Sequence, residues 1–160
     1  MEELVDANFF DGCRFFRVIP GFVAQFGIHG KPSVSALWRD KTIPDDNVTQ
    51  SNVAYMVSFA TSGKDSRTTQ MFINLVDNEQ LDPMGFAPFA KITSGFDYVD
   101  EIYSENGEKP HQGYIQQDGN TYLKKNFPKL SYVVSATKRG TGAAYYAKVK
   151  AEKAGAKADL

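Results

Sequence analysis

The sequence has 160 residues, a formal net charge of −1 and an aromatic content of 13%. This length favours a single domain with a sizeable core, and twelve Phe and eight Tyr favour packing over disorder. The near-zero charge excludes any argument from overall charge for binding nucleic acid or an anionic membrane. We therefore expect a globular protein that binds neither nucleic acid nor membrane.

Cellular location is inferred from three features of the sequence. No apolar run approaches the roughly 18 residues of a membrane-spanning helix. The single cysteine, Cys13, cannot close an intramolecular disulfide. Residues 1–6 are acidic and lack the basic and apolar regions of a signal peptide. Together these features predict a soluble protein that is cytoplasmic by default.

In chain order, residues 1–8 read as the last turns of a helix, and residues 96–103 carry apolar side chains at helical spacing. Short β-branched and aromatic runs bounded by turn residues predict strands at 15–19, 54–59, 70–75, 89–92, 113–116 and 130–134. Glycines and prolines punctuate residues 104–129, which we expect to be a long irregular connection. Many short strands separated by turns favour an antiparallel sandwich or barrel.

The composition changes at Lys138. Residues 138–160 contain seven alanines and six basic residues against two acidic ones. We expect a domain over 1–137 and an exposed basic tail over 138–160, partly helical around 143–154. The tail alone would allow an RNA- or membrane-binding module, but a solvated charged tail is the simpler interpretation.

The residues available for chemistry are few. The two histidines, His29 and His111, lack partners at metal-ligand spacing, so we expect no metal and no cofactor. His29 is expected to be a solvent-exposed structural residue, and Cys13 a packing residue rather than a nucleophile. What remains is Arg17 among apolar aromatic residues, together with two nearby glutamines and no evident nucleophile or base.

Prolyl isomerisation suits such an inventory because it breaks no covalent bond. Its barrier of roughly 20 kcal/mol arises from the amide resonance that is lost when the C–N bond twists. The prolyl nitrogen then gains a lone pair, which a permanently charged guanidinium stabilises more in the twisted state than in the planar states. Composition alone does not select this reaction.

Three motifs occur in order along the chain. Residues 15–27 read FFRVIPGFVAQFG, residues 66–74 read SRTTQMFIN, and Leu81-Asp82 is followed by GFAPFAKI over residues 85–92. This set closely resembles the signature segments of cyclophilin-type peptidyl-prolyl cis-trans isomerases, and the similarity runs from about residue 1 to residue 136. The resemblance implies a mainly β fold, an antiparallel eight-stranded barrel capped by two helices. It also implies action on Xaa-Pro bonds in unfolded or flexible proteins.

The resemblance also implies roles for individual residues. Arg17 would be the catalytic guanidinium, supported by Gln25, with Phe22 beside it. The residues implied to bind substrate are Val23, Ala60, Thr61, Gln70, Phe72, Leu81 and Phe86.

Without the motifs, the large apolar members of this set would be read as ordinary core. In the same way, Gln25 and Gln70 could be buried amides whose hydrogen bonds are satisfied within the fold.

The sequence departs from the family pattern at several points. Gln80 stands where many members have a Trp before the Leu-Asp pair, and Thr61 stands where Asn is usual. Phe86 or a neighbour occupies the place of a His, and Val23 that of a Met. Since the family's Trp contacts cyclosporin, weak cyclosporin binding is expected here.

The largest departure concerns the start of the chain. By resemblance, about thirty residues holding two strands would precede Met1, so the barrel is expected to lack its N-terminal strands or to be completed by another chain. The alternative function is therefore a cyclophilin-fold scaffold subunit of a larger assembly with little or no isomerase activity.

Overall fold

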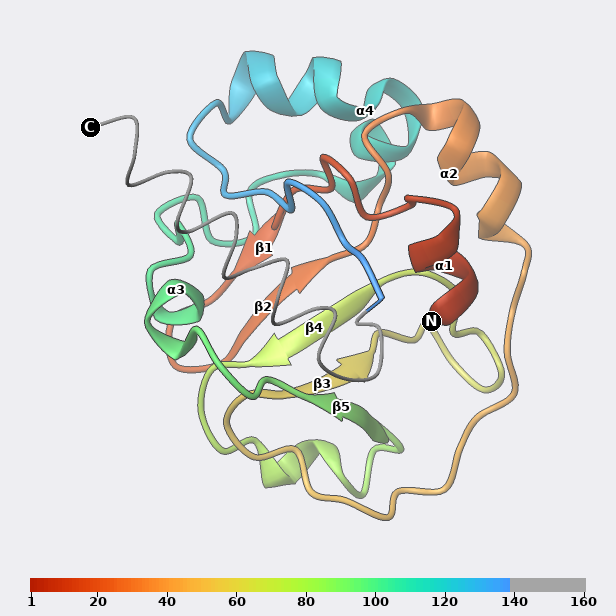
Figure 1. Ribbon diagram of the computed structural model, residues 1–160, viewed down its shortest axis with the longest axis vertical. Helices are drawn as coiled ribbons and strands as arrows, with labels where there is room; N and C mark the ends of the chain where they lie inside the picture. The colour runs from red at the N-terminus through yellow and green to blue at the C-terminus, as the bar shows by residue number, and fades with distance from the viewer. Residues whose placement is uncertain (139–160) are drawn as a thin grey trace, which may run out of the picture.

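A computed structural model describes residues 1–138 of the chain. Its centre is a five-stranded antiparallel sheet in the order β1-β2-β4-β3-β5 (Figure 1). The strands are β1 (Arg17–Val18), β2 (Val23–Phe26), β3 (Met56–Phe59), β4 (Met71–Asn74) and β5 (Pro88–Lys91). Within the described residues, β1 and β5 are the edges of this sheet.

Helices flank the sheet. They are α1 (Glu2–Asp6), α2 (Pro32–Arg39), a short 3-10 helix η1 (Glu79–Leu81), α3 (Phe96–Asp100) and α4 (Gln112–Asn126). Helices α2 and α4 contact each other, and α4 lies beyond the β1 edge of the sheet (Figure 1). The expected helices at 1–8 and 96–103 are confirmed in shorter form.

A tight turn connects β1 to β2. The Phe22 amide donates to the carbonyl of Ile19 at 3.0 Å, and Gly21 adopts φ 72°, a left-handed conformation that favours glycine. The returning strand places Gln25 directly opposite Arg17. The Pro-Gly turn therefore sets the register in which Arg17 and Gln25 face each other.

The main core lies against the sheet and contains buried aromatic side chains such as Phe9, Phe10 and Phe15, packed with Met71 of β4. A second core packs α4 against the preceding fold. It consists of Phe16, Ile28, Ile115, Leu123 and Leu130. Adjacent phenylalanines at 15 and 16 thus enter different cores, which fixes the chain segment just before Arg17.

Helix α4 bends at Gly119, which has φ 57° and ψ −136°. The bend lets the backbone amide of Asn120 donate to the carbonyl of Gly30 at 2.8 Å. A Cβ atom at position 119 would lie 2.1 Å from that carbonyl oxygen, so only glycine fits. This close approach holds α4 against the segment that leads into α2.

Some expected elements are wrong. The strand expected at 113–116 is the first part of α4, and most of the supposed irregular connection 104–129 is this helix. Ile115 precedes the non-helical Gly119 and Leu123 follows it, so no single helical period of apolar residues runs through the segment. Residues 130–134 form only an isolated bridge, between Tyr132 and Arg14, rather than a strand.

The resemblance implied an eight-stranded barrel without its N-terminal strands, and residues 1–138 form five strands. The arrangement is nonetheless mainly β, with an antiparallel sheet and flanking helices. The helix expected around 143–154 lies outside the described residues.

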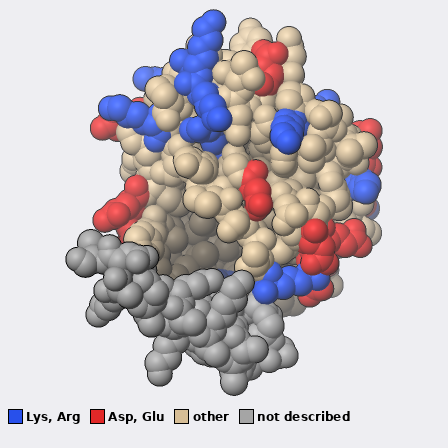
Figure 2. All heavy atoms as spheres, turned by 45° about the horizontal axis from the view of Figure 1, so that its top comes forward, with Lys and Arg blue, Asp and Glu red and all other residues tan. Residues whose placement is uncertain are grey.

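Among the described helices, none combines the length and the apolar character needed to cross a bilayer. On the face shown in Figure 2, basic and acidic side chains are interspersed, and neither sign covers it alone.

Candidate active site

An apolar pocket of about 170 Å³ opens beside the centre of the sheet. Its base is the buried group Val23, Phe72 and Leu81, with Phe22 and Phe86 packed against it. The Phe72 and Phe86 rings meet edge to face, with centroids 5.6 Å apart. We call the cavity that these five side chains bound the apolar pocket.

Neighbouring strands bring the pocket residues together. Gln25 of β2 pairs with Phe72 of β4, so the amide and the aromatic ring belong to adjacent positions of the sheet. Ala60 follows β3 and donates its amide to the carbonyl of Gln70 at 2.9 Å. Ala60 and Thr61, which directly follow the end of β3, therefore line the pocket.

Among residues 1–138, Arg17 is the one charged side chain that lines the pocket. Its Nη1 donates to Gln25 Oε1 at 3.4 Å, and its guanidinium carbon lies 5.8 Å from the Phe22 ring centroid. Its Nε donates to Glu108 Oε2 at 3.0 Å. The Arg17 side chain is 29% exposed, so the guanidinium is held at the rim and stays accessible from solvent.

Three glutamines continue from Arg17 as a chain of hydrogen bonds. Gln25 Nε2 donates to Gln70 Oε1 at 2.9 Å, and Gln70 Nε2 donates to Gln112 Oε1 at 3.2 Å. Gln112 is the first residue of α4. Because Gln25 and Gln70 each accept one bond and donate another, the chain fixes the direction in which these two amides point.

A polar groove of about 450 Å³ adjoins the apolar pocket. The two share Gln25, Ala60 and Thr61. The groove is lined on its far side by Arg39 of α2 and Gln112 of α4, and its walls are otherwise Ser, Thr and Gln side chains. An apolar pocket that continues into a polar groove suits an extended peptide with one apolar ring.

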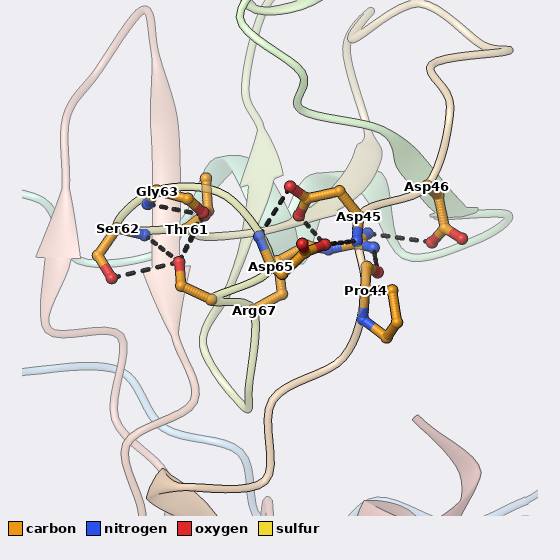
Figure 3. A network of polar contacts seen from close by, with 9 residues as sticks. Pro44, Asp45, Asp46, Thr61, Ser62, Gly63, Asp65 and Arg67 are labelled. Carbon is orange, nitrogen blue, oxygen red and sulfur yellow. Dashed lines mark hydrogen bonds and ion pairs between the residues drawn. The ribbon is translucent and has the colours of Figure 1, made fainter.

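The loop that carries Thr61 is anchored to the segment after α2 (Figure 3). Arg67, whose side chain is only 5% exposed, contacts Asp45 at 3.3 Å, Asp46 at 3.0 Å and the carbonyl of Pro44. Asp45 and Asp65 cap each other, since each backbone amide donates to the other's carboxylate, at 2.8 and 2.9 Å. The groove wall is thus fixed by a partly buried ion-pair network.

A second polar network lies behind the apolar pocket. Asn78 Nδ2 donates to the carbonyl of Phe22 at 2.9 Å and to Asn74 Oδ1 at 2.9 Å. Asp82, next to Leu81, accepts from the Ser51 hydroxyl at 2.5 Å and from the backbone and side chain of Asn52. These bonds, with Ser51 first, lower the pKa of Asp82. The network holds two walls of the pocket in place.

Comparison with known proteins gives the family. The model of the cyclophilin type peptidyl-prolyl cis-trans isomerase family matches residues 1–122. The chain belongs to this family. Peptidyl-prolyl cis-trans isomerase A of Dickeya dadantii is 34% identical over 105 residues, and the Acinetobacter baylyi peptidyl-prolyl cis-trans isomerase is 35% identical over 112. Peptidyl-prolyl cis-trans isomerase B of Bacillus subtilis is 33% identical over 108 residues.

These matches are partial in length. They cover 62%, 63% and 67% of this chain and 55%, 56% and 73% of the three relatives, so the chain spans little more than half of the first two. Two solved structures of a Cryptosporidium parvum cyclophilin share the fold at 20% identity, with TM-scores of 0.55 and 0.53. Each comparison covers 68% of this chain, and 72% and 73% of the respective solved chains. The cyclophilin fold expected from the motifs is confirmed.

The structure brings the cyclophilin motif residues to one place. Nine of the ten candidates line the apolar pocket: Arg17, Phe22, Val23, Gln25, Ala60, Thr61, Phe72, Leu81 and Phe86. The tenth, Gln70, lies in the adjoining groove. Gln80 does not line the pocket; it is exposed and donates to Asn78 Oδ1 at 3.2 Å.

Sequence reasoning missed three polar residues of the site, Arg39, Glu108 and Gln112. Arg39 ends a helix that was not expected, and the other two lie where an irregular connection was expected. No helical spacing of apolar residues marks Gln112 as a helix start, because the backbone leaves the helical conformation at Gly119. Nothing in the local sequence points to Glu108 as a partner of Arg17.

Cys13 and His29 lie outside the pocket. Cys13 is fully buried, its thiol donates to the Phe9 carbonyl, and burial raises its pKa to about 12, so the expected packing role is confirmed. His29 is half-buried rather than solvent-exposed, because its ring packs on Phe9 and its Nδ1 accepts from the Lys31 amide at 2.9 Å. Burial lowers the His29 pKa. Within residues 1–138, no three potential metal ligands cluster.

Proposed function

We propose that this chain is a peptidyl-prolyl cis-trans isomerase that acts on exposed Xaa-Pro bonds of flexible or unfolded proteins. The observation that carries the proposal is the placement of the Arg17 guanidinium at the rim of the apolar pocket, with Gln25 beside it. The pocket would hold the pyrrolidine ring while the peptide on its N-terminal side turns about the prolyl bond.

The chemistry follows from amide resonance. Twisting the prolyl C–N bond localises a lone pair on nitrogen, and Arg17 would donate a hydrogen bond to it. Because this interaction strengthens in the twisted state, it lowers the barrier more than it strengthens ground-state binding. No covalent bond breaks, so the proposed reaction needs no cofactor.

The polar groove would hold the peptide backbone. In this proposal Gln70, Ala60 and Thr61 contact the residue before proline, mostly through amide and main-chain groups. Such contacts recognise the peptide backbone rather than one particular side chain. The site would therefore accept substrates whose sequences around proline vary. One of the Cryptosporidium parvum structures was determined in the presence of the dipeptide Ala-Pro, which supports a proline-containing ligand for this family.

The test is the rate of cis-trans exchange of a short Ala-Pro peptide, measured by NMR exchange spectroscopy with catalytic amounts of the full chain. We expect exchange well above the uncatalysed rate, whose time constant is tens of seconds. Binding of the peptide without faster exchange would overturn the proposal and favour the scaffold function.

A further inference from the structure

Arg17 is paired with one carboxylate in the described chain, that of Glu108. Glu108 comes from the segment that leads into α4, ninety-one positions along the chain from Arg17. The Nε of Arg17 donates to Glu108 Oε2 at 3.0 Å, a distance typical of a well-formed hydrogen bond. This pair lies on the side of the guanidinium that Gln25 does not occupy.

The backbone places the two side chains next to each other. The Val18 amide donates to the carbonyl of Gly107 at 3.1 Å. Val18 follows Arg17 and Gly107 precedes Glu108, so one main-chain hydrogen bond joins the neighbours of both partners. Pro110, two residues further on, is buried and holds the segment against the fold. The position of Glu108 is therefore set by the fold as well as by the ion pair.

The two ends of the hydrogen-bond chain meet in this same segment. At one end Glu108 accepts from Arg17 Nε, and at the other end Gln112 accepts from Gln70 Nε2. Glu108 and Gln112, together with Pro110 and His111, also line a cleft of about 440 Å³. Arg17 lines both this cleft and the apolar pocket, so it lies where the two meet.

An arginine side chain that is held by a single hydrogen bond can still rotate about the bonds nearest its guanidinium. A guanidinium with anchors at Nε and at Nη1 has its plane fixed, because the fork is rigid and planar. Gln25 alone supplies a long contact of 3.4 Å, whereas Glu108 supplies the shorter bond. Fixing a reacting group in its productive orientation raises the rate without requiring tighter substrate binding.

We propose that Glu108 is a positioning residue for the isomerase reaction: it fixes the plane of the Arg17 guanidinium so that the Nη edge is presented to the prolyl bond in the apolar pocket. The inference rests on the proposed function. Glu108 itself does not line the apolar pocket, so it acts through Arg17 and not on the substrate.

The test compares three single variants of the full chain, together with Glu108→Ala in an Arg17→Ala background, in the peptide exchange assay. Glu108→Ala removes the anchor, and Glu108→Gln keeps an oxygen that can accept from Nε. The matched control is Glu105→Ala, which removes an exposed carboxylate of the same loop that accepts from the Tyr103 hydroxyl. Melting temperatures are measured alongside.

We expect Glu108→Ala to lower kcat about two- to fivefold with KM unchanged, a range set by the energies of exposed ion pairs. Glu108→Gln should restore most of the rate, and Glu105→Ala should leave it unchanged. In an Arg17→Ala background, Glu108→Ala should have no further effect. Equal rates for Glu108→Ala and Glu105→Ala would overturn the proposal, as would Glu108→Gln being as slow as Glu108→Ala.

A second readout does not depend on activity. In NMR spectra of the isotope-labelled chain, the Arg17 Nε–H signal should shift and exchange faster with water in Glu108→Ala, and stay in place in Glu105→Ala. An unchanged signal in Glu108→Ala would overturn the inference even if the enzyme is active. An inactive wild-type chain with the expected shift would instead overturn the proposed function and leave the anchoring role of Glu108 established.

Discussion

Arg17 and Gln25 are direct cross-strand partners in β1 and β2, and the Arg17 guanidinium donates to the Gln25 side-chain oxygen at 3.4 Å. Side chains at opposed positions of an antiparallel pair lie on the same face of the sheet. The Pro-Gly turn between the two strands therefore determines which amide stands beside the guanidinium. Gln25 in turn donates to Gln70, which links the guanidinium to the groove.

Replacing Gln25 with Ala should slow catalysis about tenfold, because a hydrogen bond to a charged group is lost and Gln70 loses its donor. The peptide exchange assay measures this change. Gln117→Ala is the matched control, since Gln117 is an exposed residue of α4 that lines neither the pocket nor the groove. Unchanged activity in Gln25→Ala would contradict the role assigned to this amide.

The second prediction concerns cyclosporin, because the resemblance implies that Gln80 stands where many family members have a Trp that contacts this ligand. Losing an indole hydrogen bond and part of an aromatic wall should weaken binding by about 2–4 kcal/mol, or roughly 30- to 1000-fold. Gln80 is exposed and bonded to Asn78, so it adds little apolar surface near the pocket. Titration calorimetry with the wild type and Gln80→Trp measures the difference.

The variant should bind cyclosporin more tightly while peptide exchange changes little, because the apolar pocket does not include residue 80. Tight binding by the wild type, or no gain in Gln80→Trp, would show that residue 80 does not correspond to the family's Trp.

The pocket itself was predictable because its residues sit in contiguous motifs. Arg17, Phe22 and Gln25 fall within thirteen consecutive residues, and a turn signal between them fixes their register. The strand that carries Phe72 and the strand that leads to Ala60 were visible as β-branched and aromatic runs.

The second side of the site could not be predicted in this way. Its residues, Glu108 and Gln112, approach Arg17 and Gln70 only through tertiary packing of α4. The helix was hidden because Gly113 and Gly119 disfavour helices in isolation. At Gly119 the tertiary contact with the Gly30 carbonyl requires glycine, so the same residue that weakens the local signal makes the packing possible.

Cys13 should be inert in the folded protein. Its thiol is fully buried, and its pKa of about 12 leaves almost no thiolate, the reactive form, at neutral pH. Under native conditions a thiol reagent such as Ellman's reagent should react only after global unfolding, at a rate that rises with denaturant. Rapid stoichiometric labelling without denaturant would contradict the burial of this residue.

The Asp82 carboxylate should make the stability of the folded protein depend on pH. Its folded pKa is lowered, first by the Ser51 hydroxyl, relative to an ordinary value of about 3.9. The carboxylate therefore contributes stability that is fully present above the unfolded pKa and lost as pH falls through the folded pKa. Relative to wild type, Asp82→Asn should be less stable at neutral pH, and the gap should narrow on acidification.

Urea melts of the two proteins between about pH 7 and pH 2 test this linkage. Asp118→Asn, which alters an exposed residue of α4, is the control and should parallel the wild type. A stability gap for Asp82→Asn that stays constant across this pH range would show that the carboxylate is not stabilised by its hydrogen bonds.

The central claim is that the Arg17 charge acts on the twisted prolyl bond. The most direct measurement is the catalysed cis-trans exchange rate of an Ala-Pro peptide for the wild type and Arg17→Ala, with peptide affinity and melting temperature recorded for both. We predict a loss of about 100-fold or more in kcat, typical of removing a donor that acts in the transition state, with little change in affinity or melting temperature. Equal kcat values in the two proteins would contradict the claim.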